Sequence, residues 1–244
     1  MLSDEEWQEA VRTMKLRNMR ARISEIFESI QGEGILVGVR QLFVRFSGCN
    51  LRCNYCDTPA EINVCTDYVA NRIVENPVSS SYVQSLIDNS ENIHSICFTG
   101  GEPMLYADFI SFLRKTKPFY LETNMSLPEQ AKKLKFVDYV AGDLKVREAG
   151  NPDYDRLLEN TIKSFRILKN TRRRLTFCKI ILPTKFDAEE VENSAESIKD
   201  YVYCFVLQPV FGAKIDEILR LQKRMMNFKD TRLIPQVHKY LGVK

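Results

Sequence analysis

The chain has 244 residues, of which 44% are hydrophobic and 27% charged, so it is long enough to bury a sizeable core. Its formal net charge of +3 is small for this length and gives no reason to propose nucleic acid or a membrane surface as a direct partner. The sequence contains no apolar run long enough to span a bilayer and no secretory signal peptide, and we expect a cytoplasmic protein.

The first segment of the chain is predicted to be separate from the rest. Apolar residues recur at a helical period among charges over residues 1 to about 20, which predicts an amphipathic helix. We assign residues 1–21 to an N-terminal helical extension and residues 22–244 to one domain. A first strand is expected over Arg22–Ile30. The sequence Gln31-Gly32-Glu33-Gly34 then predicts a sharp turn where backbone can approach a ligand closely.

The next strand carries an unusual charge. Gln41–Phe46 is rich in β-branched and aromatic residues and is predicted to be a strand. Arg45 lies within it, and two interpretations stay open. It is either an outward-facing polar residue of an alternating strand, or an inward-pointing guanidinium placed to clamp a carboxylate or phosphate.

Three cysteines, Cys49, Cys53 and Cys56, follow this strand at C-x3-C-x2-C spacing. A compact loop of this kind can aim three thiolates at one iron–sulfur cluster. A cubane cluster has four irons, so three cysteines leave one iron able to take a small molecule. Zinc is the main rival because it also takes thiolates, but zinc sites usually pair two knuckles and no second knuckle exists here. We therefore predict an iron–sulfur site.

The other four cysteines are predicted to have no ligand role. Cys97, Cys178 and Cys204 lie inside apolar strand-like runs and are expected to be small buried hydrophobic residues. Cys65 falls outside the tight spacing of the loop, and we treat it as incidental rather than as a spare ligand. The odd count and the length of the chain argue against a disulfide framework.

After a less regular stretch, residues 68–92, with a helix near Ser81–Asp88, strands and helices alternate regularly. The predicted strands are Ser95–Thr99, Phe119–Leu121, Val137–Ala141, Phe177–Leu182, Val202–Leu207 and Leu233-Ile234. The predicted helices between them are Tyr106–Lys115, Pro128–Leu134, Tyr154–Leu168, Ala188–Lys199 and Ile215–Met226. Such units imply an α/β fold with a parallel sheet and outer helices. About six units are too few for a closed barrel of eight, so we expect an incomplete (β/α)6 TIM-like barrel.

Polar residues cluster just after the carboxyl ends of these strands. Gly100-Gly101-Glu102, Glu122-Thr123-Asn124, Asp143-Lys145 and Gln208 all occupy such positions, and the cysteine loop follows a strand in the same way. In folds of this class ligands bind at that rim. The sequence therefore predicts one site at the C-terminal ends of the parallel strands.

The cysteine motif, with Tyr55 before its last cysteine, and Thr99-Gly100-Gly101-Glu102-Pro103 together resemble the radical S-adenosylmethionine (SAM) enzymes. The resemblance implies a [4Fe–4S] cluster on the three cysteines, with SAM chelating its open iron and giving a 5′-deoxyadenosyl radical after one-electron cleavage. It implies that Glu102 accepts from the ammonium group of SAM. The implied SAM site consists of Tyr55, Thr99, Gly100, Gly101, Glu102, Glu122, Asn124 and Lys145.

A narrower resemblance covers the chain from about residue 23 onward. Residues 25–34, 43–51 and 56–58, Leu207-Gln208-Pro209 and residues 235–239 look like the family of 7-carboxy-7-deazaguanine synthases. Those enzymes convert 6-carboxy-5,6,7,8-tetrahydropterin into 7-carboxy-7-deazaguanine with loss of ammonia, toward the transfer RNA bases queuosine and archaeosine.

This narrower resemblance also implies roles for single residues. Arg45 and His238 would hold the substrate carboxylate. Glu33 and Gln208 would bind the pterin edge, beside the backbone of Ile30, Gln31 and Gly32. Thr58 would be a ligand of Mg2+, which prefers hard oxygen ligands. The catalytic set would be Cys49, Cys53, Cys56, Arg45 and Glu33. A flavodoxin or ferredoxin as electron donor and a homodimer are further implications.

Two departures and three alternatives accompany this hypothesis. Met125 stands where the family usually has glycine, and Asp143-Leu144-Lys145 stands where it often has Ser-Pro-Lys, which affects the implied SAM contacts. A radical SAM activase of a glycyl-radical or other protein partner is the second hypothesis, because that Asp-Leu-Lys also occurs in such enzymes. An iron–sulfur electron carrier and an enzyme acting directly on transfer RNA are further alternatives, the last disfavoured by the small net charge.

Overall fold

The protein is described by a computed structural model over residue 3 and residues 19–56, 63–210 and 212–244. Its strands are β1 Arg20–Ala21, β2 Ile23–Ile30, β3 Arg40–Phe46, β4 Val64–Asp67, β5 Arg72–Glu75, β6 Val78–Ser79, β7 Ser95–Gly100, β8 Phe119–Thr123, β9 Tyr139–Asp143, β10 Leu175–Leu182, β11 Phe205–Pro209 and β12 Thr231–Leu233. Its α-helices are α2 Ser80–Asn89, α3 Ala107–Phe112, α4 Pro128–Ala131, α5 Tyr154–Ile167, α6 Ala188–Glu196, α7 Ile215–Met225 and α8 Val237–Leu241. Short 3-10 turns lie at η1 Gly34–Leu36, η2 Pro103–Tyr106, η3 Lys132–Leu134, η4 Arg147–Ala149 and η5 Lys199–Tyr201.

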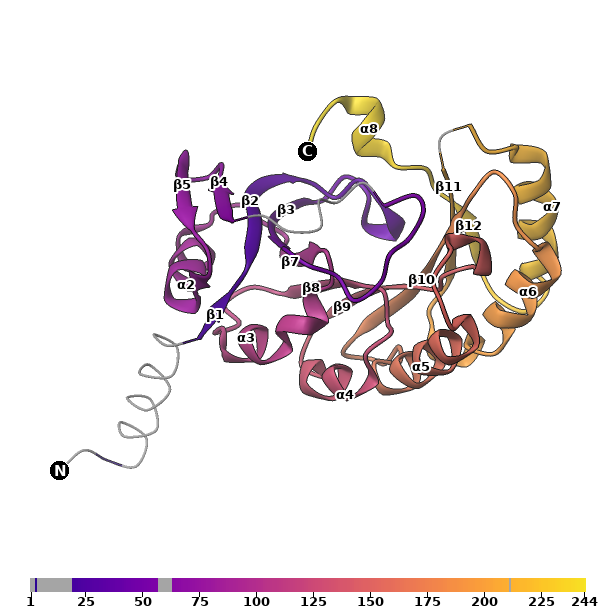
Figure 1. The fold of residues 1–244 in the computed structure, drawn as a ribbon, viewed down its shortest axis with the longest axis horizontal. Coiled ribbons are helices and arrows are strands. Elements are labelled where there is room, and N and C mark those ends of the chain that lie inside the picture. The colour runs from indigo at the N-terminus through magenta and orange to yellow at the C-terminus, as the bar shows by residue number, and fades with distance from the viewer. Residues whose placement is uncertain (1–2, 4–18, 57–62, 211) are drawn as a thin grey trace.

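Ten strands form one sheet in the order β12-β11-β10-β9-β8-β7-β3-β2-β4-β5, and β1 pairs with β6 in a separate small sheet. From β3 through β7 to β12 every neighbouring pair is parallel, whereas β2 is antiparallel to β3. The helices α3 to α7 follow one another along the outer side of the curved sheet (Figure 1). The predicted incomplete α/β barrel is therefore confirmed, with β3 as its first parallel strand.

Some elements differ from the sequence-based prediction. Strand β4 lies just before the less regular stretch of residues 68–92, and β5 lies within it; the sequence predicted neither strand of this hairpin, nor α8. Strand β9 was predicted over Val137–Ala141 but runs over Tyr139–Asp143, so both of its ends lie two residues later and Asp143 is its last residue. The predicted first helix lies almost wholly outside the described residues, and Arg20 and Ala21 form β1. No helix in the described part of the chain is long and apolar enough to cross a membrane.

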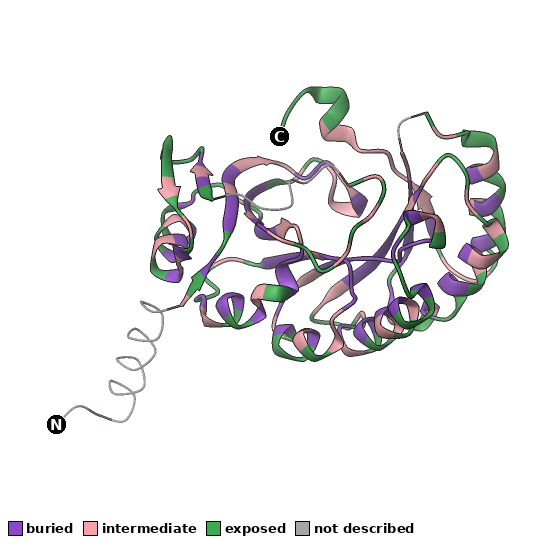
Figure 2. Ribbon diagram, viewed as in Figure 1, coloured by how far each residue is buried: buried purple, intermediate pink, exposed green. Residues whose placement is uncertain are grey.

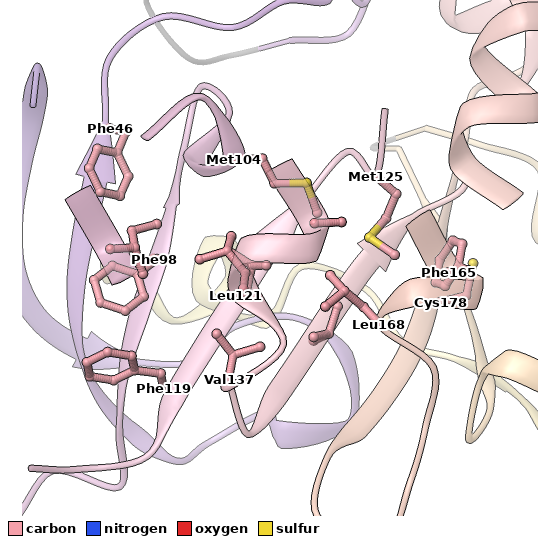
Figure 3. Packing of buried hydrophobic residues seen from close by; sticks show 14 of the residues in the cluster. Phe46, Phe98, Met104, Phe119, Leu121, Met125, Val137, Phe165, Leu168 and Cys178 are labelled. Atoms are coloured by element: carbon pink, nitrogen blue, oxygen red, sulfur yellow. The ribbon is translucent and has the colours of Figure 1, made fainter. Parts of the chain in front are cut away.

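Each strand of the arc sends alternate side chains to two different cores. On β7, Ile96 and Phe98 join the large core between sheet and helices, while Cys97 lies on the other face. Figure 3 shows part of the large core, where Phe46, Phe98 and Phe119 pack beside one another. Figure 2 shows that the strands are mostly buried while the helices expose their outer faces. Cys97, Cys178 and Cys204 are fully buried, as predicted.

The inner face of the sheet carries an apolar layer and, two residues further along each strand, a polar one. The apolar layer contains Phe43, Cys97, Tyr120, Ala141, Phe177 and Val206. Since side chains two apart share one face of a strand, the next inward positions lie directly above it, toward the carboxyl ends. They are Arg45, Thr99, Glu122, Asp143, Lys179 and Gln208. The inner face of the sheet is thus apolar in its lower layer and polar or charged at the carboxyl ends of the strands.

Met125 occupies a backbone conformation that favours glycine. Its φ is +58°, and its side chain is fully buried. The left-handed region costs a non-glycine residue about 1 kcal/mol, whereas deleting a buried methionine side chain costs about 2–4 kcal/mol. Here the packing gain outweighs the strain, which explains why methionine is tolerated at this position.

We therefore expect Met125→Gly to lower the free energy of unfolding by about 1–3 kcal/mol, since it loses the buried side chain but relieves the strain. Met125→Ala keeps the strain and should be about 1 kcal/mol less stable than Met125→Gly. Chemical denaturation of both variants and the parent measures this. An alanine variant as stable as the glycine variant would contradict the strain.

Candidate active site

A cavity of about 560 Å³ opens at the carboxyl ends of the parallel strands. It is lined by Cys49, Cys53, Cys56, Tyr55, Thr99, Gly100, Gly101, Glu122, Asn124 and Lys145, and by Ile30, Gln31, Gly32, Glu33, Arg45, Gln208 and His238. Among the predicted site residues that the structure describes, only Glu102 lies off this wall. Thr58 falls outside the described residues. The volume is typical of a small-molecule site.

The three motif cysteines lie in the loop that leaves β3. Cys49 and Cys56 are exposed and Cys53 is half-buried, and none of the seven cysteines, all of which are described, forms a disulfide. In the described part of the chain no group of three or more Cys, His, Asp or Glu side chains converges on a single metal ion. A cubane does not need such convergence, because each of its thiolate ligands binds a different iron. Three thiolates on one loop, with no histidine among them, are a donor set that fits a cluster.

Two buried asparagines support the cysteine loop. Asn151 donates from Nδ2 to Cys53 Sγ at 3.3 Å, and its Oδ1 accepts from the backbone N–H of Arg52 at 3.1 Å. Asn124 donates from Nδ2 to Cys49 Sγ at 3.7 Å and to Asn50 Oδ1 at 3.1 Å. Hydrogen bonds to thiolate ligands orient them and tune the potential of a cluster. Asn124, which was expected to hold SAM, thus contacts the cysteine loop.

Gly100 and Gly101 bring the end of β7 against the cysteine loop. Gly100 has φ +114°, and a Cβ on Gly101 would lie 1.9 Å from the carbonyl oxygen of Gly48. The backbone N–H of Gly101 donates to Phe46 O, and that of Glu102 donates to Gly48 O, both at 2.9 Å. Glycine is needed at position 101 because no side chain fits between these two segments.

Glu102 lies beneath the loop rather than in the cavity. Its carboxylate accepts from Met104 N at 2.8 Å, from Thr123 Oγ1 at 2.6 Å and from Asn124 N at 2.8 Å. It is fully buried, and burial raises its pKa to about 7 against the effect of these donors. Its two oxygens thus hold the start of η2 and the end of β8 together, and the contact with the ammonium of SAM stays a prediction.

Lys145 and Asp143 form a buried ion pair at the wall near Tyr55. Lys145 Nζ lies 2.7 Å from Asp143 Oδ2 and 5.7 Å from the centroid of the Tyr55 ring. Burial would lower the pKa of Lys145, but the attraction of Asp143 keeps that pKa raised. The Asp-Leu-Lys segment thus supplies a cation with its own counter-ion in the half of the cavity that holds the cysteines.

The opposite half of the cavity is formed by the turn after β2. The side chain of Gln31 is fixed by Gln41, from Nε2 to Oε1 at 3.0 Å, and accepts from Glu33 N at 2.9 Å. A Cβ on Gly32 would lie 2.2 Å from His238 Nδ1, so glycine lets the histidine of α8 close over the turn. The Gly-containing turn and the C-terminal segment are therefore in direct contact at this wall of the cavity.

The carboxylate of Glu33, in this half of the cavity, is bonded by the side chains of Lys179 and Gln236. Lys179 Nζ lies 2.6 Å from Glu33 Oε2, and Gln236 Nε2 donates to Glu33 Oε1 at 2.6 Å. Burial by itself would raise the pKa of Glu33, but Lys179 and the amide donors of Gln236 and Gln208 lower it to about 2. Gln208 Oε1 is buried without a hydrogen-bond partner. An unpaired acceptor at a cavity wall is a position for a ligand N–H or O–H.

Arg45 lies on the inner face of β3 and lines the cavity, so its side chain points inward, while its role in clamping a carboxylate or phosphate stays a prediction. Its Nη1 pairs with Glu25 Oε2 at 3.0 Å, and its guanidinium lies 5.2 Å from the centroid of the Phe27 ring. The side chain is 36% exposed, so it faces the open cavity and is available to an anionic ligand.

Sequence reasoning missed Lys179, Glu25, Gln236 and Asn151. Lys179 had a signal, because a lysine inside the apolar run of β10 is as unusual as the arginine of β3. Glu25, Gln236 and Asn151 have no comparable signal, because polar residues in such segments are ordinary.

Comparison with known proteins gives a consistent result. The family model described as Radical SAM superfamily matches residues 43–198. The chain is 68% identical to the 7-carboxy-7-deazaguanine synthase of Archaeoglobus fulgidus, over 93% of this chain and 100% of that protein. It is 36% identical to the 7-carboxy-7-deazaguanine synthase of Methanothermobacter thermautotrophicus, over 93% of this chain and 99% of that protein.

Solved structures match in fold. QueE from Escherichia coli superposes with a TM-score of 0.57 at 18% identity, covering 92% of this chain and 98% of that one. SuiB from Streptococcus suis, bound to the precursor peptide SuiA, gives a TM-score of 0.55 at 14% identity, covering 96% of this chain and 55% of that one. At these identities the likeness concerns the fold alone.

Proposed function

We propose a reaction and a residue assignment from one premise: the chain belongs to the radical SAM superfamily and, within it, to the 7-carboxy-7-deazaguanine synthases. The reaction is conversion of 6-carboxy-5,6,7,8-tetrahydropterin to 7-carboxy-7-deazaguanine with loss of ammonia. The observation that carries the assignment is that the cysteine loop and a charged turn face each other across one cavity. The comparisons with known proteins confirm the family that the sequence motifs predicted.

In this assignment the half of the cavity with the cysteines holds the cluster and SAM. When bound, these would supply 5′-deoxyadenosyl radical chemistry to the cavity. Cys49, Cys53 and Cys56 are the thiolate ligands, and Asn151 and Asn124 orient two of them. Gly100 and Gly101 let backbone approach SAM, Lys145 offers a cation for its carboxylate, and Glu102 keeps this wall in shape from behind.

The other half holds the pterin. Glu33, ionised and aimed inward, suits the adjacent N–H donors of an aminopyrimidinone edge, and the unpaired Gln208 Oε1 suits a further N–H. Arg45 and His238 lie where a substrate carboxylate would find positive charge and a ring N–H. The proposal also includes Mg2+ with Thr58 as a ligand and a flavodoxin or ferredoxin as electron donor. It further includes a homodimer, a cytoplasmic location and a place in the queuosine or archaeosine pathway.

The test is which substrate stimulates SAM cleavage. Under anaerobic conditions the reconstituted protein is given reductant and SAM, together with carboxytetrahydropterin, transfer RNA or a glycyl-radical enzyme. We expect only the pterin to be consumed. Consumption of RNA, or formation of a protein radical, with the pterin untouched would favour the two enzyme alternatives instead.

Arg45→Ala separates substrate binding from SAM binding. We expect the Kd of the carboxypterin to rise about 10- to 100-fold, since a charged partner of the substrate carboxylate is removed, while the SAM Kd changes little. Arg40→Ala is the matched control, because Arg40 lies on the same strand but pairs with the outer residue Glu28. Equal weakening of SAM and pterin by Arg45→Ala would contradict the assignment.

A further inference from the structure

Lys179 is a fully buried lysine in the polar layer that lines the cavity. It lies on β10, two residues after Phe177 of the apolar layer, and its side chain is only 3% exposed. A buried ammonium is costly unless carboxylates surround it, and removing one member of such a group leaves an uncompensated charge. A lysine at this depth therefore needs a specific reason.

Three carboxylates from three other elements surround its ammonium. Glu33, from the turn after β2, lies 2.6 Å from Nζ; Glu122 of β8 forms a second direct ion pair; Asp143 Oδ1 of β9 lies 3.7 Å away. Burial would lower the pKa of Lys179, but these carboxylates raise it well above its usual value. The ammonium thus stays charged and joins the two halves of the cavity.

Glu33 depends on this ammonium for its charge. The groups that act on its carboxylate are Lys179 of β10 and the neutral amides of Gln208 on β11 and Gln236 before α8, while Glu122 and Asp143 pair with the same lysine. Only Lys179 among these is a cation. Without it, burial favours the protonated acid, which can no longer accept two adjacent N–H donors.

We propose that Lys179 is a positioning residue that keeps Glu33 ionised and fixed, and thereby sets the specificity of the cavity for ligands with two adjacent N–H donors. This rests on the proposed function, in which Glu33 binds the aminopyrimidinone edge of the pterin. Glu122, through its bond from Thr99 Oγ1 at 2.8 Å, anchors the ammonium from the SAM side. Lys179 itself needs no contact with substrate for this role.

The experiment measures the Kd of carboxytetrahydropterin by anaerobic calorimetry on the cluster- and SAM-loaded protein from pH 6 to pH 9. The wild-type profile records the pH dependence that comes from the ligand and from the other groups of the cavity, among which His238 lies against the turn that carries Glu33. Relative to it, Lys179→Met should bind about 100-fold more weakly near pH 6 and recover as pH rises, because Glu33 then ionises. Lys179→Arg keeps the charge and should follow the wild-type profile. Glu33→Gln should be weak at every pH.

Lys133→Met is the control for loss of a paired lysine, because Lys133 pairs with Asp108 outside the cavity. The SAM Kd reports whether each variant is intact. Lys179→Met with wild-type binding, or with a loss equal at every pH, overturns the inference. So does a Lys179→Arg profile whose pH dependence differs from that of the wild type, which keeps the test decisive if the methionine variant does not fold. If wild-type protein does not bind the pterin, the proposed function fails instead.

Discussion

Cys53→Ala is expected to abolish both the bound cluster and the cleavage of SAM. Cys53 is one of three thiolates available to the cluster, and its sulfur is the one oriented by Asn151. Two remaining cysteines would hold only two of the four irons, so the protein would bind the cluster too weakly to keep it. Iron content, the visible absorbance of the reconstituted protein and release of 5′-deoxyadenosine measure the effect.

Cys65→Ala is the matched control for that variant. Cys65 is fully buried in β4 and belongs to the large core, so its loss should leave iron content and SAM cleavage unchanged. Replacing Cys49 or Cys56 should reproduce the loss seen with Cys53→Ala. A Cys53→Ala protein that keeps a cluster able to cleave SAM would refute the assignment of the three ligands.

Gly101→Ala is expected to have a similarly large effect without removing any ligand. The new Cβ would lie 1.9 Å from the carbonyl oxygen of Gly48, which is backbone and cannot rotate away. The cysteine loop must therefore shift, breaking the bonds from Gly101 N to Phe46 O and from Glu102 N to Gly48 O. We expect cluster loading and SAM cleavage to fall at least about 10-fold, because small misplacements of reacting groups are costly.

Gly38→Ala controls for the substitution itself. Gly38 has φ +90° but open space around its Cβ position, so alanine there brings backbone strain without a clash at the cysteine loop. The control should lose stability in thermal unfolding yet keep its iron. Normal cluster loading in Gly101→Ala would show that the two segments are not held as closely as described.

Much of the fold could be predicted because the parallel strands are short apolar runs ending in polar groups. Ser95–Thr99 and Phe177–Leu182 were found within two residues at either end for that reason. The hairpin of β4 and β5 could not be predicted, because each strand has only four residues, β5 lies at the edge of the sheet, and Ile73 and Val74 lie among charges. The five-residue α8 is too short to show a period.

The site was predictable where strand order fixes position. Residues just after parallel strands meet at one rim, so Glu122 and Gln208 were expected there and line the cavity. What each side chain contacts could not be derived from spacing. The carboxylate of Glu102 bonds Thr123 and the backbone of Met104 and Asn124, which no spacing indicates. Lys179 was missed because it lies three residues before the end of β10, whereas Glu122 and Gln208 each lie one residue before the end of their strands.

The central claim, that the cysteine loop and the charged turn form one site acting on a pterin, is tested most directly by a single anaerobic turnover assay. Reconstituted protein, reductant, SAM, Mg2+ and carboxytetrahydropterin are combined, and 7-carboxy-7-deazaguanine and ammonia are quantified. We predict equal amounts of both, and neither when SAM or reductant is omitted. SAM cleaved to 5′-deoxyadenosine while the pterin is recovered intact would contradict the claim.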